Sequence, residues 1–249
     1  MKKFFIRTRL KKLVWSALEP QCWGAILRNS YPSFEHTKLR NYLCGQSIDM
    51  IFDVGANVGQ FAVFSTIYFK GVPIHSFEPL EACFDKLSQV SDLYLNINPH
   101  NLALGSENKK LRLKFGSQLD SSSILSFSTA LESNYGVSDS GASALVDTQR
   151  GDTFIRHKGL DVQFNRGLLK IDVQGYELHV LKGMGKFISS FAFIYVELSF
   201  VELYTGQASA SEVIAFLFEN NFELVSIFNT DLQSDGSALQ ADFLFKRLV

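Results

Sequence analysis

The chain has 249 residues, of which 46% are hydrophobic and 20% are charged, and its formal net charge is −1. This length is typical of one domain with a large core, and this composition is typical of a soluble globular protein. A net charge this close to zero gives no general attraction to nucleic acid, so we expect no nucleic-acid partner.

The N-terminus carries an excess of positive charge. The first 28 residues hold seven of the 24 Lys and Arg residues but a single acid, Glu19, which gives this segment a charge of +6. Charges interrupt its apolar runs, so it does not resemble a signal peptide. Phe4, Phe5, Leu10, Leu13 and Val14 can share one face of an amphipathic helix. Such a helix either contacts anionic lipid or packs on the main domain, and we favour packing because amphipathic helices are common in globular proteins.

The next part of the chain alternates between strand and helix patterns. In chain order these are a mixed helical segment over 31–46, a strand at 50–54, a helix at 58–70, a strand at 73–77, a helix at 80–90, and a third strand at 93–97 that resumes at 100–104. Strands alternating with helices of this length predict βαβ units around a parallel sheet.

Residues 108–148 interrupt this alternation. They contain LRLKF, the cluster Ser121–Ser123, a second Ser/Gly-rich patch near 133–143, and no strong helical period. We expect strands and loops inserted beside the sheet, and loops of this kind often contact substrate. Ser122 and Ser123 are therefore candidates for an acceptor pocket. The alternative is a plain surface hairpin with serine-rich loops.

Regular patterns return after residue 150. They predict a helix at 151–157, a strand at 167–173, a helix at 176–184, an apolar central strand at 191–200, a helix at 209–220, and strands at 222–229 and 241–247. The last two strands are joined by a polar loop, which predicts an antiparallel hairpin at one edge of the sheet.

The strand ending at Asp53 leads into a glycine-rich turn, Gly55-Ala56-Asn57-Val58-Gly59, and then into a helix. Glycines allow a tight turn and a close approach of ligand to backbone, and a helix start offers free N–H donors. The spacing is G-x-N-x-G rather than the G-x-G-x-x-G of dinucleotide sites, and no Walker Gly-Lys-Ser/Thr follows. The Asp53 carboxylate repels a pyrophosphate but suits a ligand with an amino group or a sulfonium.

Glu78 follows the second strand, in the segment HSFEPL. A carboxylate at this point of a nucleotide-binding fold accepts hydrogen bonds from the ribose hydroxyls. The alternative is a solvent-facing acid at a strand end. With the glycine turn upstream, we favour ribose binding.

Six blocks of the chain resemble, in the same order, those of FkbM-type S-adenosylmethionine-dependent methyltransferases. The resemblance runs from about residue 48 to 229, and its blocks are IFDVGANVGQF, HSFEP, NLALG, SSSIL, LLKIDVQGYELHVLKGM and YVELSF. The block KIDVQGYE is the most specific, whereas DVGANVG is shared by many methyltransferases. The family commonly has Glu where this chain has Gln174, so a role for an acid at that position does not carry over.

The resemblance implies a class I methyltransferase fold, an α/β Rossmann-like three-layer sandwich. Its seven-stranded sheet is mostly parallel, with an antiparallel edge strand. The basic N-terminus carries little of this resemblance, and its charge and apolar pattern predict that residues 1–46 are a basic helical arm packed on the core. Residues 47–249 are then the methyltransferase domain, with 108–148 as its substrate-side insertion. The implied reaction is O-methylation of a small-molecule or glycan acceptor, often a sugar or a secondary metabolite.

The resemblance also implies a cofactor site for S-adenosylmethionine. Asp53, Gly55, Asn57 and Gly59 line its methionine end, Glu78 holds the ribose, and Asn101 and Leu102 lie beside the adenine. With their neighbours, the expected cofactor-binding set is Asp53, Gly55, Ala56, Asn57, Gly59, Gln60, Glu78, Pro79, Asn101, Leu102 and Asp172.

The block around Asp172 has chemistry of its own. Asp172 ends a predicted central strand at the carboxyl edge of the sheet, where ligands bind in open α/β folds. Methyl transfer to a hydroxyl requires alignment and removal of the hydroxyl proton, so a carboxylate base helps. Asp172 is the first candidate and Glu197 the second. Lys170 and Glu177 are candidate substrate residues, although Glu177 could instead stabilise a helix start. The alternative for Lys170–Glu177 is a strand-to-helix turn with a salt bridge. A buried Lys170 with acids on either side is consistent with both interpretations.

Other site types have little support. Three cysteines without paired or metal-ligand spacing favour a reducing, cytoplasmic location over a disulfide framework. Five scattered histidines form no HxxxH or HExxH pattern, so we expect no metal site. Two rival functions are a non-catalytic cofactor-binding module and a nicotinamide-dependent oxidoreductase, and the latter lacks its glycine motif.

Overall fold

The computed structural model describes residues 19–117 and 121–248. The amphipathic helix expected over Phe4–Val14 lies outside these residues. The first described elements are a short 3-10 helix, η1 (Pro20–Cys22), and the helices α2 (Trp23–Leu27) and α3 (Thr37–Leu43). Leu39 and Leu43 of α3 are buried in the core.

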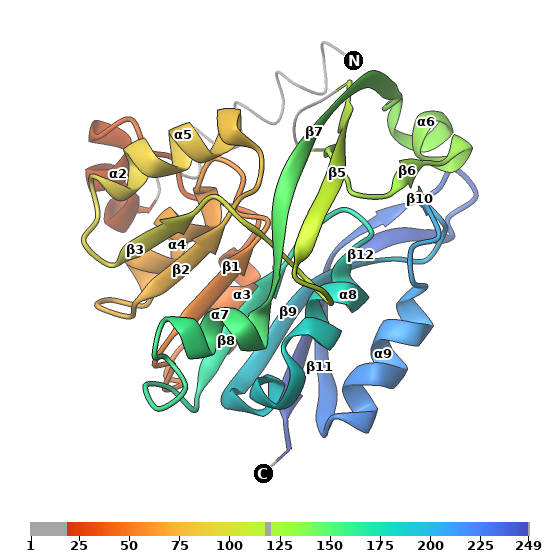
Figure 1. Cartoon of the computed structure of the whole chain (residues 1–249). Coiled ribbons are helices and arrows are strands. Elements are labelled where there is room, and N and C mark those ends of the chain that lie inside the picture. The colour runs from red at the N-terminus through yellow and green to blue at the C-terminus, as the bar shows by residue number, and fades with distance from the viewer. Residues whose placement is uncertain (1–18, 118–120, 249) are drawn as a thin grey trace.

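The described residues form a seven-stranded sheet in the order β11-β12-β9-β8-β1-β2-β3 (Figure 1). Its strands are β1 (Ile51–Val54), β2 (Ile74–Phe77), β3 (Ile97–His100), β8 (Gly167–Ile171), β9 (Phe191–Ser199), β11 (Phe222–Leu232) and β12 (Ala238–Arg247). Neighbours from β3 through β9 pair in parallel, whereas β12 pairs antiparallel with both β9 and β11. The predicted seven-stranded, mostly parallel sheet is confirmed, and its antiparallel strand lies second from one edge, with β11 outermost.

Helices cover both faces of this sheet, which makes three layers. On one face lie α7 (Gly151–His157), α8 (Glu177–Gly183), the 3-10 helix η3 (Gly185–Ser190) and α9 (Ala210–Glu219), and Figure 1 shows α7, α8 and α9 in front of the sheet. On the other face α3 and α4 (Gln60–Tyr68) pack their apolar residues. The amphipathic α5 (Glu81–Ser91) packs beside β3.

Strand residues alternate between the two cores, as the twofold period of a strand requires. In β1, Phe52 and Val54 belong to the core under α7 and α8, whereas Ile51 belongs to the core under α3 and α4. Asp53 therefore points to the α3/α4 face. The same alternation applies along β8 and β9, so the polar residues of the central strands gather on one face of the sheet.

The segment predicted as an insertion, 108–148, forms its own structure above the carboxyl edge of the main sheet. Strands β4 (Ala103–Gly105), β5 (Lys109–Gly116) and β7 (Asp139–Arg150) make a three-stranded sheet, and β6 (Ser126–Phe127) pairs with β10 (Tyr204–Thr205). Figure 1 shows β5 and β7 rising as a long ribbon beyond the ends of β1 and β8.

Two predictions about elements were wrong. Residues 93–96 form turns, and β3 begins only at Ile97, because the apolar side chains of Leu93 and Leu95 are exposed rather than packed as in a strand. The helix α6 (Thr129–Tyr135) was not predicted. It begins where the Ser128 side chain accepts a hydrogen bond from the Leu131 N–H, a local N-cap that needs no long helical period.

Candidate functional site

A pocket lies at the carboxyl edge of the sheet, where β1, β2 and β8 end. It is bounded by the turns that follow these strands, by residues 102–104, and by the inserted segment at Ser122 and Ile124. Seven of the residues singled out from the sequence line it, namely Gly55, Asn57, Glu78, Pro79, Leu102, Ser122 and Asp172. Apolar side chains such as Phe77, Leu104 and Leu113 complete the wall. The pocket therefore combines an apolar wall with a few carboxylate and amide groups.

The backbone of the turn after β1 lies close to the backbone of the turn after β8. Gly55 has a φ of +77°, and a Cβ atom at this position would lie 1.8 Å from the Asp172 carbonyl oxygen. Asn57 also has a positive φ, of 48°, which Asn tolerates better than most residues. Gly55 thus lets the β1–α4 turn lie directly against the β8–α8 turn, and both turns line the pocket.

Glu78 is fixed at the pocket wall by two backbone donors. Its Oε2 accepts from the Asn57 N–H at 2.9 Å and its Oε1 accepts from the Leu80 N–H at 2.8 Å. Each oxygen keeps a second lone pair for a ligand hydroxyl. Burial raises the pKa of Glu78 to about 7, although both N–H groups and the charge of Lys170 oppose this shift.

Asp53 is fully buried behind this wall and faces a cation of the protein itself. Lys170, on the adjacent strand β8, places its Nζ 3.2 Å from Asp53 Oδ1 and donates to the Gly55 carbonyl at 2.8 Å. Neither side chain is among the described residues that line the pocket. The expected direct contacts of Asp53 with cofactor and of Lys170 with substrate are thus not supported, because strand alternation turns both side chains toward α4.

Asp172 is the candidate base that the structure brings to the pocket. It follows the last residue of β8, and its side chain is 40% exposed. One oxygen, Oδ1, accepts from Gln174 Nε2 at 2.8 Å, and the other, Oδ2, lies 3.8 Å from Lys170 Nζ. A carboxylate held in this way has a defined direction and an adjacent positive charge.

Glu197 on β9 lies behind Asp172 rather than in the described lining of the pocket. Its Oε2 accepts from Gln174 Nε2 at 3.2 Å, so a single amide contacts both candidate bases. Burial, together with the charge of Asp172, raises the pKa of Glu197 well above its usual range. Glu197 is thus poised to hold a proton, whereas Asp172 faces the pocket.

Glu177 supports the turn that carries Asp172. Its Oε1 accepts from the N–H groups of Gly175 at 2.9 Å and Val173 at 3.3 Å, and burial raises its pKa to about 7. The described pocket lining does not include Glu177, so its expected contact with substrate is not supported. A carboxylate at the first residue of α8 is instead well placed to stabilise the helix start.

The other predicted residues support the pocket from outside its described lining. Asn101 donates through Nδ2 to the carbonyls of Glu78 and Pro79, and Ser123 donates through Oγ to the Gln174 carbonyl at 2.6 Å. Ala56 is buried and donates its N–H to Phe77 O. Gly59 has a φ of 87° and precedes α4, and the exposed Gln60 begins that helix.

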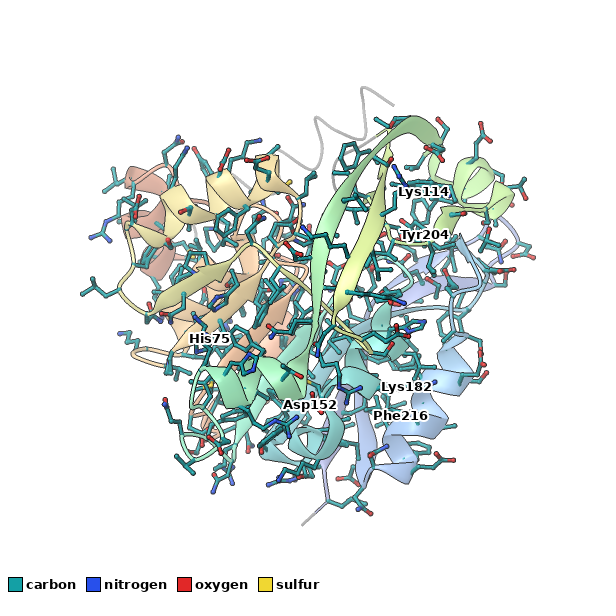
Figure 2. All side chains as sticks on the ribbon, in the orientation of Figure 1. His75, Lys114, Asp152, Lys182, Tyr204 and Phe216 are labelled. Carbon is teal, nitrogen blue, oxygen red and sulfur yellow. The ribbon has the colours of Figure 1, made fainter. Side chains whose placement is uncertain are left out.

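Besides the apolar wall, three hydrogen-bonding residues of the site were not predicted. Gln174 and Tyr176 line the pocket, and Tyr204 donates to Gln174 Oε1 at 2.6 Å. Figure 2 shows Tyr204 on the same side as Lys114, well apart from His75 of β2. Gln174 could have been found as a polar residue in the turn after a central strand. Tyr204 carries no such signal, because it reaches the site through β10, far along the chain.

The described residues contain no group of three or more His, Cys, Asp or Glu side chains arranged to hold a metal ion. Within the same part of the chain, every helix falls short of the combined length and apolar character that a membrane span requires.

Comparison with known proteins gives a family match over most of the chain. Residues 53–224 match the family described as the methyltransferase FkbM domain. The hexuronic acid methyltransferase AglP of Haloferax volcanii is 28% identical over 152 residues, which are 60% of this chain and 56% of that protein. The 2-O-methyltransferase NoeI of Sinorhizobium fredii is 34% identical over 90 residues, 36% of this chain and 35% of that protein. The chain thus spans about half the length, or less, of these curated relatives.

Solved structures show a looser likeness. TrmK of M. capricolum, in complex with S-adenosyl-homocysteine, matches with a TM-score of 0.49 and 9% identity over 86% of this chain and 68% of that chain. TehB of Haemophilus influenzae matches with a TM-score of 0.49 and 8% identity over 92% of this chain and 67% of that chain.

Proposed function

This chain belongs to the methyltransferase FkbM domain family, whose methyl donor is S-adenosylmethionine, and we propose that it methylates a hydroxyl group of a sugar-containing acceptor. The observation that carries the proposal is the meeting of Glu78 and Asp172 in one pocket at the carboxyl edge of the sheet. The Glu78 carboxylate is suited to accept hydrogen bonds from ribose hydroxyls, and the Asp172 carboxylate is suited to accept the proton of the acceptor hydroxyl.

The pocket fits a nucleoside cofactor. When bound, S-adenosylmethionine supplies a methyl group activated by a sulfonium charge. Glu78, with one lone pair left on each oxygen, is suited to accept from the two ribose hydroxyls. Pro79 and Leu102 offer apolar surface for the adenine, and the turn at Gly55 and Asn57 lies beside Asp172, where the methionine end would lie.

Asp172 is suited to remove the acceptor proton. An aliphatic hydroxyl is a weak nucleophile at neutral pH, so a carboxylate within reach lowers the barrier as the oxygen attacks. The Nζ atom of Lys170 lies 3.8 Å from Asp172 Oδ2, whereas Gln174 contacts the other oxygen, Oδ1. Alignment of the acceptor oxygen with the methyl group supplies the rest of the acceleration.

The sugar acceptor is supported by the relatives and by the inserted segment. One relative is named a hexuronic acid methyltransferase and another a 2-O-methyltransferase. In this chain Ser122 and Ile124 bring the inserted segment to the same pocket as Asp172. Polar and apolar groups together suit the hydroxyl edge and the ring face of a sugar.

The test is transfer of a labelled methyl group from S-adenosylmethionine to a panel of glycans and uronic acids, followed by mass spectrometry. We expect one added methyl group on a carbohydrate hydroxyl. Cofactor binding with no transfer to any acceptor would favour a non-catalytic module. The absence of a thermal shift with S-adenosylmethionine or S-adenosylhomocysteine would contradict the proposal, because a ligand of the folded state raises the melting temperature.

A further inference from the structure

We propose that Gln174 is a positioning residue: its amide separates Asp172 from Glu197 and holds the Asp172 carboxylate toward the pocket. The inference rests on the proposed function, in which Asp172 accepts the acceptor proton. It goes further by giving a role to Gln174, to which the proposed function assigns none.

The side chain of Gln174 makes three hydrogen bonds. Nε2 donates to Asp172 Oδ1 at 2.8 Å and to Glu197 Oε2 at 3.2 Å, while Oε1 accepts from the Tyr204 hydroxyl at 2.6 Å. The two N–H bonds of the amide thus reach one oxygen of each neighbouring carboxyl group, and each of these oxygens accepts one of them. The Tyr204 hydroxyl fixes the opposite end and thereby the orientation of the amide.

The backbone of Gln174 is also held in an unusual conformation. Its φ is +56°, in the left-handed region that a residue other than Gly, Asn or Asp rarely occupies. The Ser123 hydroxyl donates to its carbonyl at 2.6 Å, and Gly175, with a φ of +95°, follows. Strain of this kind persists where surrounding contacts fix it, and it often occurs at functional sites. Here it directs the amide back toward the end of β8.

The groups that face this cluster come from every element packed around it. The charged ones are Asp53 of β1, Lys170 and Asp172 at the end of β8, Glu177 of α8, Glu197 of β9, and Asp242 of β12, which pairs with Glu197 in register. Three phenols also face it, namely Tyr135, Tyr195 and Tyr204. Acids outnumber cations in this set, and the neutral amide of Gln174 lies between Asp172 and Glu197 without adding to their negative charge.

A glutamate at position 174 could not take this place unprotonated. Its oxygen would face Asp172 and Glu197 at the positions where the amide now donates, and three acceptors would then share the space. Glu197 is already poised to hold a proton, and an ionised glutamate at position 174 beside Asp172 would add a second like charge, so one further carboxyl group must retain a proton. A retained proton competes with the one that Asp172 is to accept.

The experiment compares the parent with Gln174→Glu across pH, with Gln46→Glu as the matched control. Gln46 is exposed, at the other end of the sheet, so the control adds the same charge away from the cluster. The first measurement needs no acceptor. The melting temperature of Gln174→Glu should approach that of the parent near about pH 5 and fall below it by about 4 °C near pH 8, because the extra proton held in the folded state is lost. The control should show a difference that does not change with pH.

The second measurement is methyl transfer. For Gln174→Glu, kcat near neutral pH should fall about tenfold and the acid limb of its pH profile should move to higher pH, while the Kd for S-adenosylmethionine changes less than about threefold. If Gln174→Glu unfolds at neutral pH, recovery of its fold near pH 5 supports the same coupling.

Melting and kcat profiles of Gln174→Glu that run parallel to those of the parent at every pH would overturn the proposal. A parent protein that binds S-adenosylmethionine but methylates no acceptor would instead remove the proposed function. In that case the melting-temperature comparison still decides whether the amide separates the two carboxylates.

Discussion

Glu78 shows how one residue can make cofactor binding depend on pH. Two backbone N–H groups fix its carboxylate, and burial raises its pKa to about 7. Ribose hydroxyls donate most strongly to the ionised form, which prevails above this pKa. The affinity for S-adenosylmethionine should therefore rise with pH through the neutral range.

The first prediction concerns Glu78→Gln and Glu78→Ala. Both should weaken S-adenosylmethionine binding by about tenfold or more near pH 8, since a charged acceptor of hydroxyl groups is lost. In the parent the Kd should increase as pH falls below about 7, and this dependence should vanish in Glu78→Gln. Isothermal titration at several pH values measures both effects, and an unchanged pH dependence in Glu78→Gln would contradict the assignment.

The second prediction concerns Asp172→Asn. This change keeps the size of the side chain but removes the proton acceptor, so kcat should fall by about 100-fold or more while the Kd for S-adenosylmethionine changes less than about threefold. Single-turnover kinetics with saturating cofactor separate the two quantities. A weaker Kd for S-adenosylmethionine with an unchanged kcat would contradict this prediction and place Asp172 in cofactor binding alone.

At the scale of elements, the site depends on two turns in contact. The β1–α4 turn and the β8–α8 turn approach so closely that Gly55 has no room for a Cβ atom beside the Asp172 carbonyl. Lys170 of the neighbouring strand β8 strengthens this contact, since its Nζ donates to the Gly55 carbonyl. The two turns should thus move and melt together.

The third prediction compares Gly55→Ala with Gly71→Ala. Both glycines have a φ of +77°, but a Cβ atom at Gly71 would meet open space. Gly71→Ala should therefore cost about 1 kcal/mol of backbone strain, whereas Gly55→Ala should cost more than about 3 kcal/mol because the turns must separate. Thermal melts of the two variants test this, and equal losses of stability would contradict a tight contact between the turns.

Helices and strands with a strong apolar pattern were predicted from the sequence. Elements that depend on a local cap or on tertiary packing were not. The run FAFIYVELSF was expected in the sheet interior, and β9 lies there between β8 and β12. The helix α6 has local caps at both ends, Ser128 at its start and Gly136, with a φ of 67°, at its end. The turn over 93–96 contains apolar residues that remain exposed, so hydrophobic character alone misplaced the start of β3.

At the scale of the whole molecule, buried ionisable groups shape the dependence of stability on pH. Burial raises the pKa of Glu78 and of Glu177 to about 7, above the value of about 4.3 in an unfolded chain. The folded state holds extra protons in this interval, so stability declines as pH rises through it. Burial also lowers the pKa of His36 and His100 to about 3 and of His75 to about 4. Stability is then lost as pH falls below about 6.5, where unfolded histidine becomes protonated.

The fourth prediction follows from these opposite slopes. Without ligand, the melting temperature should be highest near pH 6.5 and should fall by about 4 °C by pH 8, because two carboxyl groups lose their protons. Differential scanning calorimetry in buffers of matched ionic strength measures this. Glu78→Gln should show about half of the decline, and a melting temperature that rises from pH 6.5 to 8 would contradict the prediction.

The sequence by itself determined the alternating α/β order, the glycine turn, the carboxylates Glu78 and Asp172, and the family. Each of these features depends on the spacing of apolar residues within one segment or on a short contiguous motif, so the sequence of that segment is enough to predict it. Only the tertiary structure decided which polar residues face the pocket. Asp53 and Lys170 neutralise each other beneath it, and Gln174 joins Asp172, Glu197 and Tyr204 from three parts of the chain. Such contacts depend on strand register and on the direction of each side chain, and neither is encoded in the spacing of residues along the sequence.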